Sequence, residues 1–286
     1  MNETTVARDG MRLSVREWTG AGAPFLLLHG LASSSRMWDQ VALRLAWAGH
    51  RVVAYDQRGH GRSGKPTSGY GFEQVAADAV AVVRALRLRR PIAVGHSWGA
   101  NVALELAVRH AGLLSGTVLV DGGFLNLRDR MDWMTARTRL APPDLSGTPV
   151  QEFLEMLRYH LGGALEITPE VEAVFLSLMR VDGHGNIHPR LSHANHLRIL
   201  RALWEQDAIG LLRRARAPTL VLAARSRGEA PDSAGFMHEK ELAAGAVRAI
   251  GDPVRFEWID GIHDIPLQRP DVVARRLLRF ARRAVG

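Results

Sequence analysis

The chain has 286 residues and no cysteine, which excludes disulfide bonds, a thiol nucleophile and a cysteine-ligated metal. Apolar residues make up 47% and charged residues 23%, a balance typical of a soluble globular chain with one large domain. The net charge of +8 comes mostly from arginines spread along expected helices, without the interleaved aromatic residues of a nucleic-acid-binding motif, so we expect no nucleic-acid partner.

The amino terminus lacks the apolar core of a secretory signal peptide. No stretch approaches the roughly 18 to 20 consecutive apolar residues that a membrane span needs. We therefore expect a cytoplasmic protein without a membrane partner. The sequence gives no indication of the oligomeric state.

Short apolar runs alternate with longer helical patterns along most of the chain. Several of the runs are apolar throughout, as expected for strands that are covered on both faces. The expected strands are 11–18, 24–30, 51–56, 91–96, 117–122, 218–224 and 254–259, and the expected helices lie near 36–49, 72–88, 98–111, 236–250 and 270–284. This alternation predicts an α/β fold with a mostly parallel sheet and helices on both faces.

The alternation breaks between residues 125 and 210, where helical stretches are separated by prolines and no good strand is found. We interpret residues 125–210 as a helical cap inserted over the carboxyl ends of the strands, so that the core domain comprises residues 1–124 and 211–286. Four histidines in this segment raise the question of a zinc site: His184, His188, His193 and His196. Because the first two flank a predicted turn and no cysteine is available, we expect no metal.

The stretch VGHSWG, residues 94–99, lies between an expected strand and an expected helix. It contains a Gly-x-Ser-x-Gly pattern centred on Ser97. In that context the pattern is typical of a nucleophile elbow, a strained turn that exposes the serine above the sheet. Gly95 and Gly99 would let the neighbouring backbones pass closely. A glycine-rich corner without chemistry is the alternative interpretation.

A serine nucleophile needs a general base and hydrogen-bond donors for the oxyanion. His263 follows the last expected strand, which is the place of the histidine in the chain order serine, acid, histidine; a surface-loop histidine is the alternative. Its neighbour Asp264 is too close in sequence to reach the far nitrogen of the same ring. The expected oxyanion donors are the backbone N–H groups of Trp98, directly after the serine, and Leu31, in the loop after strand 24–30.

Four motifs in this order resemble the α/β-hydrolase superfamily: LHG at 28–30, YDQRGHGRSGKP at 55–66, GHSWG at 95–99 and the late His263. The resemblance covers nearly the whole chain. It implies an α/β-hydrolase fold with a sheet of about eight strands and a helical cap, and a serine hydrolase that uses no metal or cofactor. Dehalogenases and epoxide hydrolases of the family carry an aspartate in place of Ser97, so these activities are not expected.

The acid of the expected triad departs from the commonest family pattern. Most members carry an aspartate in the turn after the strand equivalent to 218–224, where this chain has Arg227. Asp121, at the end of the strand that follows the nucleophile, is the favoured acid because some members place it there; a strand-ending Asp-Gly turn is the alternative interpretation. Glu229 and Asp232 lie in the same loop as Arg227 and stay open as candidates.

We expect hydrolysis of a carboxylic ester or lactone of a small to medium organic substrate. Ser97 would attack the carbonyl carbon, His263 would accept the serine proton, and Asp121 would orient the imidazole while an acyl-enzyme forms. A C–C bond hydrolase or a cofactor-free perhydrolase of the same fold uses similar parts and is the alternative among enzymes. A non-catalytic ligand-binding receptor on the same scaffold is the alternative outside them.

Overall fold

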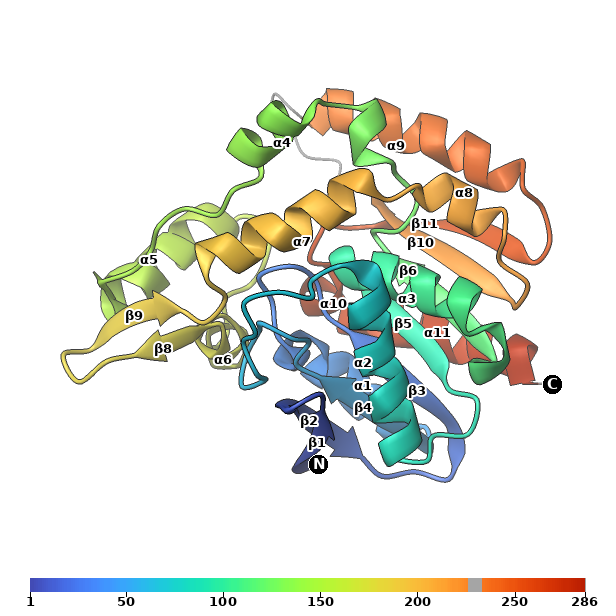
Figure 1. The fold of residues 1–286 in the computed structure, drawn as a ribbon, viewed down its shortest axis with the longest axis horizontal. Helices are drawn as coiled ribbons and strands as arrows, with labels where there is room; N and C mark the ends of the chain where they lie inside the picture. The colour runs from blue at the N-terminus through green and yellow to red at the C-terminus, as the bar shows by residue number, and fades with distance from the viewer. Residues whose placement is uncertain (226–232, 286) are drawn as a thin grey trace.

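The computed structural model describes residues 1–225 and 233–285, and its centre is an eight-stranded sheet with helices on both faces (Figure 1). In spatial order the strands are β1 (Asn2–Arg8), β2 (Met11–Trp18), β4 (His50–Tyr55), β3 (Gly22–Leu28), β5 (Ile92–His96), β6 (Gly116–Val120), β10 (Thr219–Arg225) and β11 (Val254–Asp260). The pairs β1–β2 and β2–β4 are antiparallel and all other neighbours are parallel. The prediction of an α/β fold with a mostly parallel sheet is confirmed.

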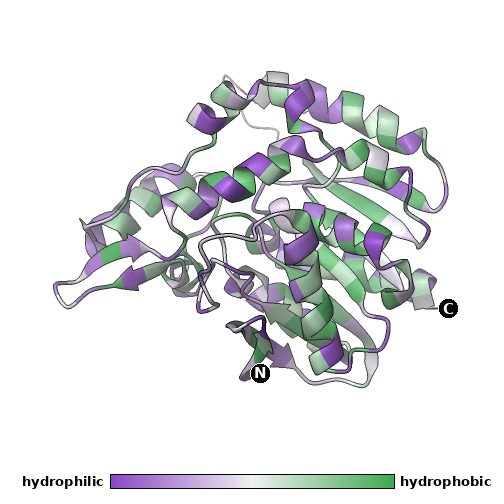
Figure 2. Cartoon of the chain, viewed as in Figure 1, coloured by the Kyte–Doolittle hydropathy of each residue, from purple (hydrophilic) through white to green (hydrophobic). Residues whose placement is uncertain are grey.

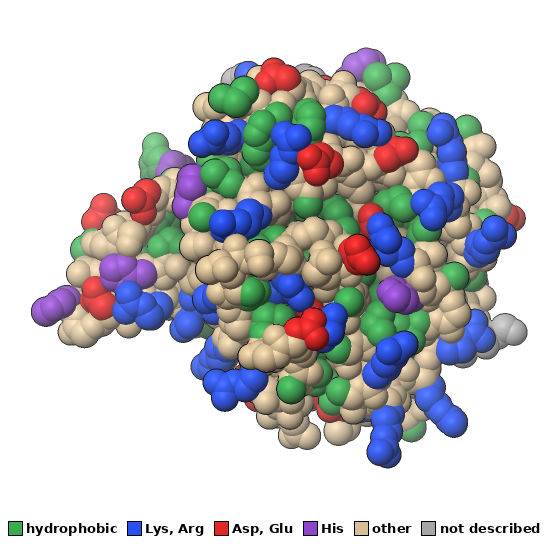
Figure 3. Space-filling view, in the orientation of Figure 1, with side chains coloured by type: hydrophobic (Ala, Val, Ile, Leu, Met, Phe, Trp, Pro, Cys, Tyr) green, Lys and Arg blue, Asp and Glu red, His purple; other side chains and the backbone are tan. Residues whose placement is uncertain are grey.

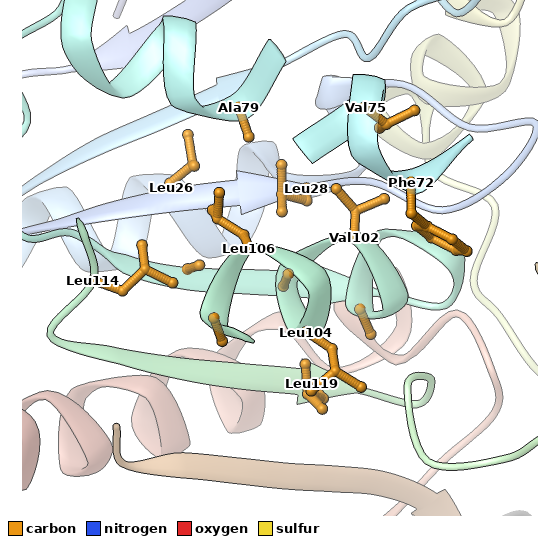
Figure 4. Close-up of a cluster of buried hydrophobic side chains, with 14 of the residues drawn as sticks. Leu26, Leu28, Phe72, Val75, Ala79, Val102, Leu104, Leu106, Leu114 and Leu119 are labelled. Carbon is orange, nitrogen blue, oxygen red and sulfur yellow. The ribbon is translucent and has the colours of Figure 1, made fainter. Parts of the chain in front are cut away.

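Alternate residues of each central strand face opposite helix layers, which explains why these strands carry mainly apolar residues on both faces. Leu26 and Leu28 of β3 belong to one buried cluster with side chains of two helices, α2 (Phe72–Ala85) and α3 (Trp98–Arg109) (Figure 4). Phe25 and Leu27 of the same strand belong to a second cluster. Figure 2 shows the resulting pattern, with hydrophobic strands inside and hydrophilic residues on the outer faces of the helices.

The remaining helices follow from the same layering. The second cluster is covered by α1 (Asp39–Trp47) and α11 (Pro270–Val285), which contact each other. The first cluster also takes in side chains of α8 (Ala208–Leu212) and α9 (Ser233–Arg248). Three further short helical segments lie between these elements: η1 (Ser35–Trp38), η2 (Ala111–Leu113) and α10 (Ile265–Gln268).

One strand of the large sheet was not expected from the sequence. β1 lies at the edge of the sheet, and Val6 is its only buried residue. Because its other side chains are polar or exposed, the segment has no apolar run that would mark it as a strand. Antiparallel pairing with β2 along its whole length holds it in place.

The segment 125–210 connects β6 and β10, which are neighbours in the large sheet, and part of it projects from one side of the molecule (Figure 1). It contains η3 (Leu127–Asp129), α4 (Trp133–Arg139), α5 (Val150–Leu161), α6 (Pro169–Ser177) and α7 (His193–Glu205). It also contains a three-stranded antiparallel sheet of β7 (Thr148–Pro149), β9 (Asn186–Pro189) and β8 (Met179–Val181). The expectation that this helical segment contains no strand is therefore wrong.

The physical reason for this error lies in the length of the three strands. They have two to four residues each, and only Met179 and Ile187 among their residues are buried. So short a stretch gives no alternation of apolar and polar residues. The cap boundaries at 125 and 210 stay a prediction.

In the part of the chain that the structure describes, no helix is both long and apolar enough to cross a membrane. On the face shown in Figure 3, the Lys and Arg side chains are spread widely, with acidic side chains between them.

Candidate active site

Ser97 occupies a sharp turn between β5 and α3. Its backbone has φ +52° and ψ −123°, in the region that L-residues rarely adopt. The flanking glycines are required by close contacts: a Cβ on Gly95 would lie 2.0 Å from the carbonyl oxygen of Gly99, and one on Gly99 would lie 2.4 Å from that of Leu28. The serine N–H donates to the carbonyl oxygen of Val120 at 3.0 Å, which ties the turn to β6. This strained geometry is that of a nucleophile elbow.

Asp121 lies directly after β6 and its side chain is fully buried. Its Oδ2 accepts a hydrogen bond from Nδ1 of His263 at 2.7 Å, although the two residues are 142 positions apart in the chain. Its Oδ1 accepts from the backbone N–H of Ala224 at 2.8 Å. A Cβ on Gly122 would lie 2.2 Å from the carbonyl oxygen of Ser97, so the chain after Asp121 passes directly beside the elbow. The structure thus brings the favoured acid and the candidate base together.

The ionisation of this pair suits a base held by an acid. Burial tends to raise the pKa of Asp121, but the hydrogen bonds and positive charges of His263 and Lys240 outweigh it and lower that pKa below its usual value. Burial tends to lower the pKa of His263, but the hydrogen bond and charge of Asp121 outweigh it and raise that pKa above its usual value. Asp121 is therefore a carboxylate at neutral pH, and His263 has an increased affinity for a proton.

His263 lies beside the residue that precedes the elbow. Its carbonyl oxygen accepts from Nε2 of His96 at 2.9 Å, and the centres of the two rings are 4.8 Å apart. Half of the His263 side chain is exposed, at 51%. Both Ser97 and His263 are among the described residues, and no hydrogen bond joins the serine hydroxyl to the imidazole. Such bonds often tighten only when substrate is bound, so the arrangement is compatible with proton transfer.

The expected oxyanion donors lie on two neighbouring backbones. Trp98 is the first residue of α3, where helical N–H groups have no partner within the helix. Leu31 follows the end of β3 in the loop that contains Gly30, whose Cβ would lie 3.2 Å from that of Ser97. Within the described ranges, neither of the two N–H groups has a hydrogen-bond acceptor. Both are therefore available to an oxygen that develops negative charge.

His60 supports this loop, a role that the sequence analysis missed. Its Nε2 accepts the backbone N–H of Ala32 at 3.3 Å, and its Nδ1 donates to the carbonyl oxygen of Arg58 at 2.9 Å. Its ring stacks on that of Trp98 with centres 5.4 Å apart. Burial lowers the pKa of His60 to about 3, which keeps the ring neutral and able to accept. The motif at 55–66 was the available signal, but it does not specify which of its residues contacts the oxyanion loop.

Lys240 was also missed. It is buried and pairs with Asp121 through a contact of 2.7 Å between Nζ and Oδ1. No local pattern in α9 indicates this contact, because the two residues are 119 positions apart. The other candidate acids, Glu229 and Asp232, and the neighbouring Arg227 lie outside the described residues.

The four histidines of the segment 125–210 do not converge. His188 forms a local chain in which Ser146 Oγ lies 2.8 Å from Nδ1 and Asp182 Oδ2 lies 2.9 Å from Nε2. His196 instead donates from Nε2 to the carbonyl oxygen of Leu140 at 3.1 Å. Among the described residues, no group of three or more His, Asp or Glu side chains is arranged to hold a metal ion.

A cavity of about 520 Å³ lies between the segment 125–210 and the loops of the core. Its walls are mainly apolar and come from α5, α6 and the stretches near Pro142 and Leu191; they include Leu145, Phe153, Leu157, Phe175 and Leu178. On the core side it reaches Ala32 and His60, which border the candidate oxyanion loop. Ser97 and His263 are not part of its wall.

The sequence matches known proteins along most of its length. A profile described as the α/β hydrolase fold matches residues 23–226. A non-heme haloperoxidase from Rhodococcus erythropolis is 42% identical over 115 residues, which are 40% of this chain and 42% of the relative. The chain thus spans less than half the length of that relative, and the next two haloperoxidases are covered to a similar extent, 43% each.

Two longer matches concern one activity. A 2-(acetamidomethylene)succinate hydrolase from Mesorhizobium japonicum is 28% identical over 218 residues, 75% of this chain and 74% of the relative. A crystal structure of an E-2-(acetamidomethylene)succinate hydrolase superposes with a TM-score of 0.78 and 21% identity, covering 98% of each chain. At this level of identity the likeness shows the fold alone.

Proposed function

Since the chain belongs to the α/β-hydrolase family, we propose that it is a serine hydrolase that cleaves a carboxylic ester or lactone through an acyl-enzyme. The observation that carries the proposal is the hydrogen bond of 2.7 Å between His263 and the buried Asp121, beside a serine with φ +52°. A buried carboxylate and a strained serine are both costly to a fold, and their position at one end of the sheet suits catalysis.

The proposed reaction uses these groups in two steps. Ser97 Oγ attacks the carbonyl carbon and His263 Nε2 takes the serine proton, while the oxyanion accepts hydrogen bonds from the N–H groups of Leu31 and Trp98. The tetrahedral intermediate collapses, and His263 returns the proton to the leaving alcohol. Water, deprotonated by His263, then attacks the acyl-enzyme and releases the acid and the free serine. Asp121 holds the imidazole in one tautomer throughout.

The apolar cavity supports a substrate with a small to medium apolar part. We propose that the segment 125–210 acts as the cap and that the apolar part of the substrate lies between it and the oxyanion loop. Leu157→Trp would fill part of this cavity. It is expected to raise KM for esters of long acyl chains more than for acetates, as measured on a matched ester series. Equal effects on both would place the substrate elsewhere.

The first test of the serine requires no knowledge of the substrate. The protein is treated with a small fluorophosphonate, its intact mass is followed over time, and the modified peptide is mapped. We expect a single adduct on Ser97, lost in Ser97→Ala and retained in Ser146→Ala, which removes the serine of the other Ser–His–Asp chain. An adduct on Ser146, or no adduct on a folded protein with an open cavity, would contradict the proposal; the second result would favour a ligand-binding receptor.

The haloperoxidase relatives favour a second candidate, a cofactor-free perhydrolase. In this reaction hydrogen peroxide replaces water in the attack on the acyl-enzyme, and the product is a peracid, which can oxidise a halide. The same serine, base and oxyanion donors serve both reactions. The wild type should oxidise bromide in a mixture of acetate and hydrogen peroxide, and Ser97→Ala should not; this result would support the perhydrolase. A rate of peracid formation no higher than the rate of ester hydrolysis would speak against it.

A further inference from the structure

Lys240 is one of only two lysines in the chain, and α9 buries it against the candidate acid. Its Nζ lies 2.7 Å from Oδ1 and 3.0 Å from Oδ2 of Asp121, and it donates to the carbonyl oxygen of Ala224 at 3.0 Å. The ring of Phe236 lies 4.9 Å from the same nitrogen. A lysine with a side chain only 6% exposed needs such partners, because they replace the water that the ammonium has lost.

The lysine completes a set of donors around the carboxylate of Asp121. Oδ1 also accepts the N–H of Ala224 at 2.8 Å, and Oδ2 accepts Nδ1 of His263 at 2.7 Å. Both oxygens are thus held, and the negative charge is shared between the ammonium and the imidazole. Without the lysine, His263 would face a buried carboxylate that has no other charged partner among the described residues.

We propose that Lys240 is a positioning residue of the hydrolytic site, which fixes the Asp121 carboxylate in its contact with His263 and balances its buried charge. This rests on the proposed role of Ser97 and His263. The lysine acts through Asp121 and is not expected to touch the substrate.

The groups that face His263 come from several elements. Asp121 lies after β6, His96 ends β5, Lys240 lies on α9, and Asp264 is the next residue in the chain. Burial lowers the pKa of His263, the two aspartates raise it and Lys240 lowers it, with a net upward shift. Burial also lowers the pKa of His96 to about 4, so His96 adds no charge at neutral pH. Loss of Lys240 should therefore raise the pKa of His263 further.

The test uses the rate constant for fluorophosphonate attack on Ser97, measured from about pH 5 to pH 9. The reaction needs neutral His263, so the rate rises with pH through the pKa of that residue. In Lys240→Met we expect the midpoint of this rise to move upward by about one pH unit, which is about a tenfold lower rate on the acidic side. Lys240→Arg keeps the charge and should leave the midpoint near that of the wild type. Lys65→Met removes the other lysine and controls for net charge.

The NMR titration of the His263 ring in the same variants gives a second measurement that does not depend on catalysis. Coincident profiles for wild type and Lys240→Met, with Ser97 labelled in both, would overturn the inference and leave the proposed function intact. An unlabelled wild type would contradict the proposed function, and the titration would still decide the coupling between Lys240 and His263. If Lys240→Met does not fold, Lys240→Gln removes the charge while keeping a hydrogen-bond donor and takes its place in both measurements.

Discussion

Among the described residues, two arrays of serine, histidine and aspartate share a short histidine–aspartate hydrogen bond but differ in burial and in the state of the serine. The core array consists of Ser97, His263 and Asp121, and the hairpin array consists of Ser146, His188 and Asp182 in the segment 125–210. The acid of the core array is fully buried, whereas Asp182 is 23% exposed.

The hairpin array is a local structural device. Asp182 accepts the N–H groups of His184 and Asn186 at 2.9 and 3.0 Å, which closes the turn between β8 and β9. Ser146 is exposed, its hydroxyl is already bonded to His188, and its N–H donates to Asp144 at 3.0 Å. The core array instead leaves its serine hydroxyl and two nearby backbone N–H groups without partners among the described residues. What distinguishes a candidate nucleophile is therefore the unsatisfied and strained backbone around it.

The largest expected effect separates the two acids. Asp121→Asn should lower the rate of Ser97 labelling or of ester turnover by about 10⁴-fold, because the amide no longer fixes the productive tautomer of His263. Asp182→Asn, the same change in the hairpin array, should leave the rate within about twofold. Circular dichroism checks that both variants fold. A near-normal rate in Asp121→Asn would transfer the role of the acid to Glu229 or Asp232.

The contact between the turn after Asp121 and the elbow can be tested with one methyl group. In Gly122→Ala the added Cβ would start 2.2 Å from the carbonyl oxygen of Ser97, so the elbow must move. We expect a loss of about 10²-fold in labelling rate and a destabilisation of about 1–3 kcal/mol in thermal unfolding. Gly112→Ala, whose Cβ would meet no atom within 4 Å, is the control. Equal effects in the two variants would argue against a tightly built elbow.

The support of the oxyanion loop should matter less than the acid itself. His60→Phe keeps the aromatic stack on Trp98 but removes the acceptor for the N–H of Ala32. We expect about a tenfold lower labelling rate, since a loop displaced by a fraction of an ångström still offers its donors. Because His60 is neutral above its pKa of about 3, the loss should be constant from pH 5 to pH 9. A loss that changes with pH would mean that His60 acts by titrating.

The smallest expected effects concern the pH dependence of stability. The stabilisation by the core array decreases as pH rises, whereas that by the hairpin array decreases as pH falls. The folded pKa of His263 lies above its usual value of about 6.5, so its protonated form stabilises the fold at low pH, and this contribution is lost as pH rises through the folded pKa. The hydrogen bond from His188 lowers the pKa of Asp182 to about 2, so its contribution is present above about pH 4 and is lost as pH falls toward 2.

Thermal unfolding of His263→Gln and Asp182→Asn against the wild type measures both contributions. The loss of thermal stability in His263→Gln, relative to the wild type, should become smaller from about pH 6 to pH 9. The loss in Asp182→Asn should become smaller below about pH 4. The same direction of change in both variants would show that the two histidine–aspartate pairs are electrostatically alike.

The sequence predicted those features that are carried by local patterns. Ser97 was predicted as a candidate because a glycine pattern stands between a strand and a helix. Asp121 was predicted because it ends the strand after the nucleophile, where some α/β-hydrolases place their acid; the catalytic roles of both stay predictions. Strand β1 and the three short strands of the segment 125–210 were missed, because each buries at most one side chain and leaves no period to read.

Contacts made by tertiary folding could not be predicted in the same way. Lys240 meets Asp121 only because α9 packs against β11, the neighbour of β10 in the sheet, and nothing in its own neighbourhood marks it as buried. His60 lies within a motif, yet its contact with Ala32 depends on how two loops pack together. Both residues are therefore found only once the distances are known.

Because the chain has only two lysines, acylation of lysine side chains can report local opening of the structure around Lys240. Amine-reactive reagents can reach the amino terminus and Lys65, which is exposed although its ammonium donates to the carbonyl oxygens of Gly61 and Ser63. Lys240 can react only while α9 is detached from the sheet, because its nitrogen is otherwise buried and occupied by three acceptor oxygens. The ratio of the acylation rates of Lys240 and Lys65 therefore measures how often α9 detaches from the sheet.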